Sequence, residues 1–122
     1  MSDTVTTLLR RGAIVAISFD PSTGSEVAKV RPAVIVSNNT ANAAAARTGG
    51  VITVIPLTSN TRRVYPFQVL VPAAQTGLPK DSKAQAEQLR SVSVTRIRDA
   101  AGWMPEDLMR QLDDAIRVQL AL

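Results

Sequence analysis

The chain has 122 residues, of which 45% are hydrophobic but only 3% aromatic, and its formal net charge is +4. This length fits one domain, whose interior must be built mainly from aliphatic side chains. The sequence contains no cysteine and no histidine, which excludes disulfides, metal sites of thiolate or imidazole ligands, and every mechanism with a cysteine nucleophile or a histidine acid or base.

The first third of the chain predicts an extension and two strands. Residues 1–10 show no clear period and are expected to form a loosely held N-terminal extension, so that a single domain spans residues 11–122. The β-branched and apolar residues at 13–19 predict a strand, followed by a dense set of turn residues. Residues 32–37 predict a second strand, buried on both faces because polar alternation is missing.

A short helix and a third strand come next. Residues 38–40 can cap a helix through the alanines at 41–46, which ends at the glycine pair 49–50. Residues 51–57 predict the third strand, and Pro56 places its end at a sheet edge or a bulge because proline cannot donate to the ladder.

The second half predicts further strands and a terminal helix. Residues 67–71 predict a fourth strand, 72–82 a loop, and 83–94 one or two more strands, although part of this last segment is equally compatible with a helix. A helix is expected to begin at 103–107, with proline and carboxylates in its first turn, and to run to the C-terminus. The pattern indicates a mainly β domain: a small barrel or curled antiparallel sheet with a short helix after the second strand and a C-terminal α-helix.

Polar residues gather at the predicted strand ends, where they can converge on one rim of the sheet. The residue before a proline is held in extended geometry, so the backbone of Arg31 is fixed at the start of its strand. Its guanidinium presents a planar fork of donors suited to a phosphodiester. Arg31 alone is more often a surface ion-pair residue, and residues 58–60 alone more often form a plain turn. Their joint occurrence favours a site.

Four segments, in this order, resemble the MazF/PemK family of messenger-RNA-cleaving toxins: GSEVAKVRPAVIVSN, VITVIPLTSN, VYPFQVLV and GLPKDSKAQAEQLRSV. The resemblance extends from about Arg11 to the terminal helix, and ordered agreement over several segments is far more specific than one short motif. The chain departs from the family's usual opening, which has an acidic residue and a tryptophan where residues 12–15 stand here.

The resemblance implies an SH3-like barrel, a homodimer, and cleavage of single-stranded RNA at short preferred sequences without metal or cofactor. In that chemistry the ribose 2′-hydroxyl attacks the adjacent phosphate, leaving a 2′,3′-cyclic phosphate and a 5′-hydroxyl. The family's toxins are held inactive by small acidic antitoxins of the MazE type. Residues 1–98 carry 12 Lys and Arg against five Asp and Glu, a charge that fits such a partner and equally fits a solvated basic surface.

By motif, Arg31 and Thr58 match the family's catalytic pair, and Glu26 matches an acidic residue often implicated. Arginine stays protonated, so Arg31 is suited to stabilising the phosphorane or donating a proton to the leaving oxygen. Thr58 can hydrogen-bond a non-bridging oxygen, and Glu26 is the first candidate for the general base.

The wider set of expected RNA contacts is Ser25, Ser37, Asn38, Ser59, Asn60, Arg62, Gln88 and Arg90. A position on an exposed sheet surface explains Gln88 and Arg90 equally well, and Arg62 is expected to position a phosphate at most.

Two other functions remain open at this point: a toxin of the same barrel type that poisons DNA gyrase without cleaving, and a non-catalytic RNA-binding barrel. The second is favoured by basic charge and weakened by the scarcity of aromatic rings. The apolar runs stay shorter than the roughly 18 residues of a membrane span, and the N-terminus lacks a signal-peptide layout. We therefore expect a soluble, cytoplasmic protein without a membrane partner.

Overall fold

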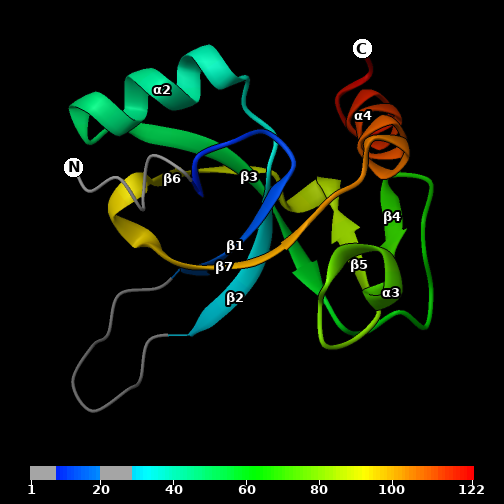
Figure 1. Ribbon diagram of the computed structural model, residues 1–122. Helices are drawn as coiled ribbons and strands as arrows, with labels where there is room; N and C mark the ends of the chain where they lie inside the picture. The colour runs from blue at the N-terminus through cyan, green and yellow to red at the C-terminus, as the bar shows by residue number, and fades with distance from the viewer. Residues whose placement is uncertain (1–7, 20–28) are drawn as a thin grey trace.

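The apolar runs of the sequence form the strands of one antiparallel sheet. The computed structural model describes residues 8–19 and 29–122, and Figure 1 shows the curled sheet with helices at its two ends. The elements in chain order are β1 (Ala13–Ser18), β2 (Val30–Ile35), α2 (Asn39–Thr48), β3 (Val51–Thr58), β4 (Gln68–Val71), α3 (Ala73–Thr76), β5 (Ser82–Gln85), η1 (Ala86–Gln88), β6 (Arg90–Ser93), η2 (Val94–Arg96), β7 (Ile97–Trp103) and α4 (Glu106–Leu120).

The seven strands are joined in the order β4-β5-β3-β2-β1-β7, and β6 pairs with β3 beside β5. All of these pairings are antiparallel. Within the described residues β4 and β7 are the outer strands and do not pair with each other. The expected curled antiparallel sheet is confirmed, and it does not close into a barrel.

The three central strands β1, β2 and β3 bury side chains on both of their faces, as was predicted for residues 32–37. In β3, Ile52 and Val54 point into one core, whereas Ile55 and Leu57 point into a second core on the opposite face. Alternate residues of β1 and β2 divide between the same two cores. A strand with two buried faces cannot carry the polar alternation of a half-exposed strand, which explains the pattern at residues 32–37.

Pro56 lies where β3 changes partners. β6 pairs with β3 up to Val54, and β5 pairs with it from Leu57 onward. The missing N–H of the proline therefore falls between the two ladders. The expected strand end at a sheet edge or a bulge is not found: β3 runs through Pro56 to Thr58 with partners on both edges. The proline is accommodated because no β5 or β6 pairing is required at its position.

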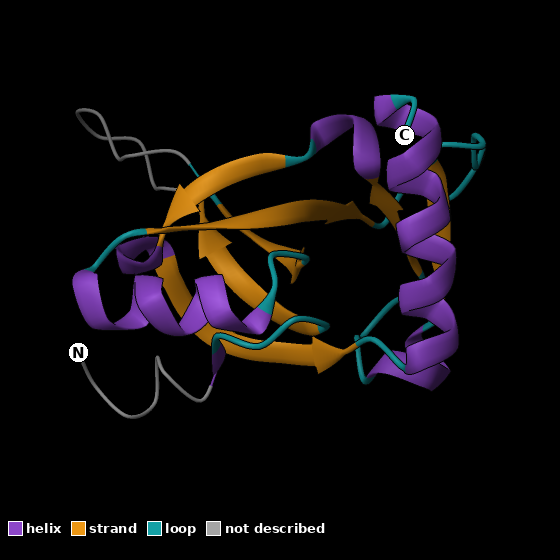
Figure 2. Ribbon diagram, turned by 90° about the horizontal axis from the view of Figure 1, so that it is seen from above, coloured by secondary structure: helices purple, strands orange, loops and turns teal. Residues whose placement is uncertain are grey.

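The two longer helices cover different cores. Asn38 caps α2 by accepting a hydrogen bond from the backbone of Ala41, and α2 ends at Gly49, whose φ of 70° favours glycine. The buried face of α4 packs onto the core that contains Leu57, whereas α2 packs onto the other core. Figure 2 shows the two helices at opposite ends of the sheet.

Two elements differ from the sequence-based expectation. β7 was not expected, because only Ile97 of its first four residues is buried and an outer strand of this kind has no apolar period. The stretch at 72–82 contains the short helix α3 and is not entirely a loop. A Cβ on Gly102 of β7 would lie 2.5 Å from the carbonyl oxygen of Thr76, so the close approach of α3 to β7 requires glycine there.

The end of the expected N-terminal extension contributes to the core. Leu9 is 4% exposed, and Leu8 packs against the same cluster of buried residues. In the part of the chain that the structure describes, none of the helices combines the length and apolar character needed to cross a membrane.

Candidate active site

Strand register brings Arg31 and Thr58 together. β2 and β3 pair through Ala33 with Pro56, Val34 with Ile55 and Ile35 with Val54. Continuing this antiparallel register by two residues places Arg31 opposite Thr58. Side chains opposite each other across such a pair have Cβ atoms about 5 Å apart. The two residues are 27 positions apart in the chain but adjacent at one rim of the sheet.

Both residues line one cavity of about 360 Å³, here called the Thr58 cavity. Its remaining walls come from the β3–β4 connection and from the segment before β5, and the full lining is Arg31, Pro32, Leu57, Thr58, Ser59, Leu78, Pro79, Lys80 and Ser82. Arg31 and Lys80 are the cations of this cavity. Three hydroxyls and two cations lining one space suit a phosphate group.

Arg31 also lines a second cavity of about 310 Å³, here called the Arg90 cavity. Its lining is Phe19, Lys29, Arg31, Pro56, Gln85, Gln88 and Arg90. The two cavities therefore meet at the Arg31 side chain, which forms a shared wall. A ligand longer than one phosphate can cross Arg31 and occupy both.

Four cations and no carboxylate line these two cavities, among the residues that the structure describes: Lys29, Arg31, Lys80 and Arg90. Within residues 8–19 and 29–122, Arg31 has neither an ion pair nor a hydrogen bond that would occupy its guanidinium donors. Such a groove attracts a polyanion, and its unpartnered donors can bind phosphate oxygens bidentately.

The hydroxyl of Thr58 is oriented by its own turn. Its Oγ1 accepts a hydrogen bond from the backbone N–H of Asn60 at 3.2 Å, and Asn60 Oδ1 in turn accepts from the N–H of Arg62 at 3.3 Å. Because the oxygen of Thr58 is engaged as an acceptor, its proton remains free to be donated to a ligand.

The loop after Thr58 is fastened to the sheet by a buried lysine. Lys83, which pairs with Thr58 across β3 and β5, is 8% exposed and donates from Nζ to the carbonyl of Arg63 at 2.5 Å. Its Nζ also lies 5.9 Å from the ring centroid of Tyr65, which stacks on Phe67 at 5.4 Å. These contacts give the cavity wall at Ser59 a fixed support.

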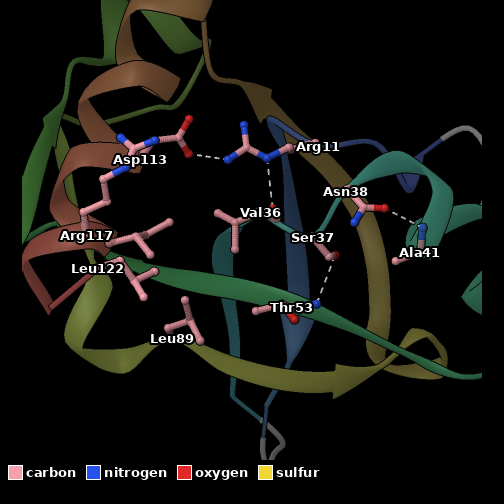
Figure 3. A pocket seen from close by; sticks show the side chains of 11 residues that line it. Arg11, Val36, Ser37, Asn38, Ala41, Thr53, Leu89, Asp113, Arg117 and Leu122 are labelled. Carbon is pink, nitrogen blue, oxygen red and sulfur yellow. Dashed lines mark hydrogen bonds and ion pairs between the residues drawn. The ribbon is translucent and has the colours of Figure 1, made fainter. Parts of the chain in front are cut away.

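Ser37 and Asn38 lie at the other end of β2, beside a separate cavity of about 640 Å³ here called the Arg11 cavity. Figure 3 shows Ser37 Oγ accepting from the N–H of Thr53 at 3.1 Å and Asn38 accepting from Ala41. Ser37 also donates to Asn42, which is fully buried. Six residues of extended chain, about 20 Å, separate Ser37 from Arg31.

The Arg11 cavity lies where two parts of the fold are joined by polar contacts. Arg11 forms an ion pair with Asp113 of α4 and donates from Nε to the carbonyl of Val36 at 3.0 Å. This contact ties the chain before β1 to the terminal helix. The donors of Arg11 are thereby engaged inside the protein, whereas those of Arg31 have no partner among the described residues.

The predicted site residues that the structure describes fall into four groups. Arg31, Thr58 and Ser59 share the Thr58 cavity, and Gln88 and Arg90 share the adjoining Arg90 cavity. Asn60 and Arg62 form the turn that follows Thr58, and Ser37 and Asn38 line the Arg11 cavity. Ser25 and Glu26 lie outside the described residues.

Phe19 and Lys29 are the charged or aromatic lining residues that the sequence did not place in the site. The register of β1 and β2 pairs Ile17 with Arg31, and its continuation puts Phe19 opposite Lys29. Phe19 was expected to lie only in a strand, because its type and position are those of a core residue. Strand pairing is the signal that would have placed it in the site.

The part of the chain that the structure describes contains no group of three or more His, Cys, Asp or Glu residues that could hold a metal ion.

Comparison with known proteins assigns the family. The model of the PemK-like, MazF-like toxins of type II toxin-antitoxin systems matches residues 10–120. The chain belongs to this family. The similarity that the sequence segments suggested to the MazF/PemK toxins is thus confirmed.

Relatives of the MazF/PemK family match over nearly the whole chain. The protein named Endoribonuclease MazF9 of Mycobacterium tuberculosis is 51% identical over 116 residues, which cover 94% of this chain and 98% of that protein. The structure of MazE-MazF (Form-II) from Deinococcus radiodurans superposes with a TM-score of 0.75 at 26% identity, covering 94% of this chain and 97% of that chain. The M. tuberculosis toxin MazF-mt6 shares the fold, with a TM-score of 0.72 at 22% identity over 90% of this chain and 97% of that one.

Replacing Ser37 by alanine tests its structural role. The variant loses the acceptor for Thr53 and the donor to the buried Asn42, and we expect the free energy of unfolding to fall by about 1–3 kcal/mol. Urea denaturation measures this, with Ser91→Ala at an exposed position of β6 as the control. RNA affinity of the folded Ser37→Ala protein then tests separately whether Ser37 contacts RNA, and an unchanged unfolding midpoint would contradict the structural role.

Proposed function

We propose that this protein is a sequence-selective endoribonuclease that cleaves single-stranded RNA and thereby inhibits translation and growth. The observation that carries the proposal is the position of Arg31, unpartnered among the described residues, opposite Thr58 in a cationic cavity. The family assignment and the relative named Endoribonuclease MazF9 support it. Messenger RNA as the substrate implies action in the cytoplasm.

The proposed reaction is an internal displacement at phosphorus. The 2′-oxygen of the ribose attacks the adjacent phosphate while its proton passes to a base, and the bond from phosphorus to the 5′-oxygen breaks. The 5′-oxygen leaves with a proton, so that the products are a 2′,3′-cyclic phosphate and a 5′-hydroxyl. Nothing in this sequence of bonds calls for a metal ion.

The two described residues have different tasks in this reaction. The fork of donors on Arg31 binds the non-bridging oxygens as negative charge builds up on the phosphorane, and it can also protonate the leaving oxygen. The free proton of Thr58 is donated to one of the same oxygens. Both groups act on the charge that grows in the transition state, which is the condition for accelerating the reaction.

Glu26 is proposed as the general base that accepts the 2′-hydroxyl proton. It is the carboxylate that the family resemblance provides in the segment before Arg31, and a carboxylate suits this role when it lies within hydrogen-bond reach of the proton. Cleavage by a Glu26→Gln variant at the wild-type rate would exclude it.

Arg31→Ala should abolish cleavage, because the phosphorane loses its bidentate cation. We expect wild-type protein to cut single-stranded RNA of varied sequence in the presence of EDTA, leaving ends that a kinase can label at the 5′-hydroxyl. Arg47→Ala, at an exposed position of α2 outside the cavities, is the control. Circular dichroism confirms that both variants are folded, and an active Arg31→Ala protein would refute the assignment. Absence of product from the wild type would leave a non-catalytic toxin or RNA-binding domain.

Thr58→Ala should slow single-turnover cleavage by roughly 10²-fold, since the loss of one donor to a developing oxyanion has about this effect. Thr58→Ser retains the hydroxyl and should keep most of the rate, which separates the hydroxyl from the methyl group. Equal rates for the alanine variant and the wild type would show that the hydroxyl does not act on the reacting phosphate.

The proposed partners are a second copy of this chain and a small acidic antitoxin of the MazE type. Solved structures of the family include a MazE-MazF assembly from D. radiodurans and an endoribonuclease in complex with its cognate antitoxin from a mycobacterial species. The cationic groove around Arg31, whose described lining residues include no carboxylate, is complementary to an acidic tail.

Native mass spectrometry of the protein purified from its host tests both partners. We expect a dimer of the chain together with a small acidic protein, and we expect moderate salt to weaken the complex because exposed charge pairs are screened. A monomer without any acidic companion would contradict the assembly.

A further inference from the structure

The Arg90 cavity contains a cation–π pair that the proposed phosphate chemistry leaves unexplained. The guanidinium carbon of Arg90 lies 5.2 Å from the centroid of the Phe19 ring. Phe19 is 8% exposed, whereas Arg90 is exposed and lines the cavity. The ring is thus covered by the guanidinium, and a ligand in the cavity meets Arg90 before it meets Phe19.

This pair is held in place from both sides. Arg96 donates from Nη1 to the carbonyl oxygens of Ser18 at 3.2 Å and Phe19 at 3.4 Å, which fixes the end of β1. Arg90 is the first residue of β6 and pairs with Val54 of β3. The guanidinium over the Phe19 ring offers a surface on which a nucleobase can stack, because unstacked RNA bases pack on arginine planes as well as on aromatic rings.

The polar groups around the platform favour one type of base edge. Lys29, Arg31 and Arg90 are pure hydrogen-bond donors, and the amides of Gln85 and Gln88 can turn either way. Carboxylates are missing from the lining residues that the structure describes. Donors therefore outnumber acceptors, which suits a base that presents carbonyl oxygens.

We propose that the Arg90 cavity binds the base of a nucleotide next to the scissile phosphate, and that it selects the keto bases uracil and guanine over the amino bases cytosine and adenine. The base stacks on Arg90, and Gln88 donates its amide to a carbonyl oxygen of the base. This inference rests on the proposed function, because it takes the ligand to be single-stranded RNA that crosses Arg31 between the two cavities.

Binding of uncleavable oligonucleotides tests the site apart from catalysis. Decamers of 2′-O-methyl uridine and of 2′-O-methyl cytidine lack the attacking hydroxyl. On the pairing edge uracil presents a carbonyl oxygen and an N3–H, where cytosine presents an amino group and an N3 acceptor. Homopolymers also present the same base in every register. We expect fluorescence anisotropy to give a Kd for the uridine decamer that is lower by roughly tenfold, as one well-placed edge contact provides.

Two kinds of variant separate stacking from edge recognition. Arg90→Lys keeps the charge but removes the plane, so both decamers should bind more weakly by roughly tenfold and the ratio of their Kd values should persist. Phe19→Leu removes the support of that plane and should act in the same direction. Gln88→Glu introduces an acceptor and repels a carbonyl oxygen, so the ratio should invert in favour of cytidine.

Matched changes away from the cavity control for charge. Arg47→Lys in α2 and Gln111→Glu in α4, both at exposed positions, should leave the ratio of the two Kd values at its wild-type level.

Equal affinity of the wild type for the two decamers, or a ratio that Gln88→Glu does not change, would overturn the inference. If the wild type cleaves ordinary RNA but binds both decamers equally well, the proposed function stands and only the base site is excluded. If the wild type binds the uridine decamer more tightly but does not cleave RNA, the base site stands and the proposed endoribonuclease activity is excluded.

Discussion

β3 is the strand on which both halves of the sheet depend. Along one edge it pairs with β2, and along the other it pairs first with β6 and then with β5. Its alternate side chains, such as Val54 and Ile55, enter different cores. A shift of register by one residue would exchange the two faces and move every one of these side chains into the wrong core. The register of β3 is therefore strongly determined, and with it the position of Thr58 relative to Arg31.

The site exists because this register carries polar residues just beyond the buried part of each strand. Arg31 precedes the three buried residues of β2, and Thr58 follows Leu57, the last buried residue of β3. The apolar residues between them hold the strands in place. Burial of aliphatic side chains thus fixes the distance between two polar groups, and an orientation that is fixed before the ligand arrives is the condition for strong electrostatic stabilisation of a transition state.

Much of this could be predicted from the sequence, for identifiable reasons. The strands around Val15, Val34 and Ile52 are rich in apolar, β-branched residues, and α2 has strong caps at Asn38 and Gly49. The pairing of strands was predicted only as a convergence at one rim, because register depends on partners that are distant in the chain. β7 was not predicted because it lacks an apolar pattern. As an outer strand it is held mainly by backbone hydrogen bonds to β1, which any sequence can make. The role of Ser37 in binding Asn42 and Thr53 likewise depends on a helix and a strand that meet only after folding.

Because Arg31 lines both cavities and the other lining residues each line one, substitutions can alter the two cavities separately. Residues such as Gln88 and Lys29 face only one of the cavities, and Thr58 and Lys80 face only the other. Substitutions at Gln88 or Lys29 can therefore alter which ligands are accepted while the reacting groups stay in place. Ligand selectivity and the rate of the reaction can therefore be engineered separately in this arrangement. Arg31 is the exception, because a substitution there changes both.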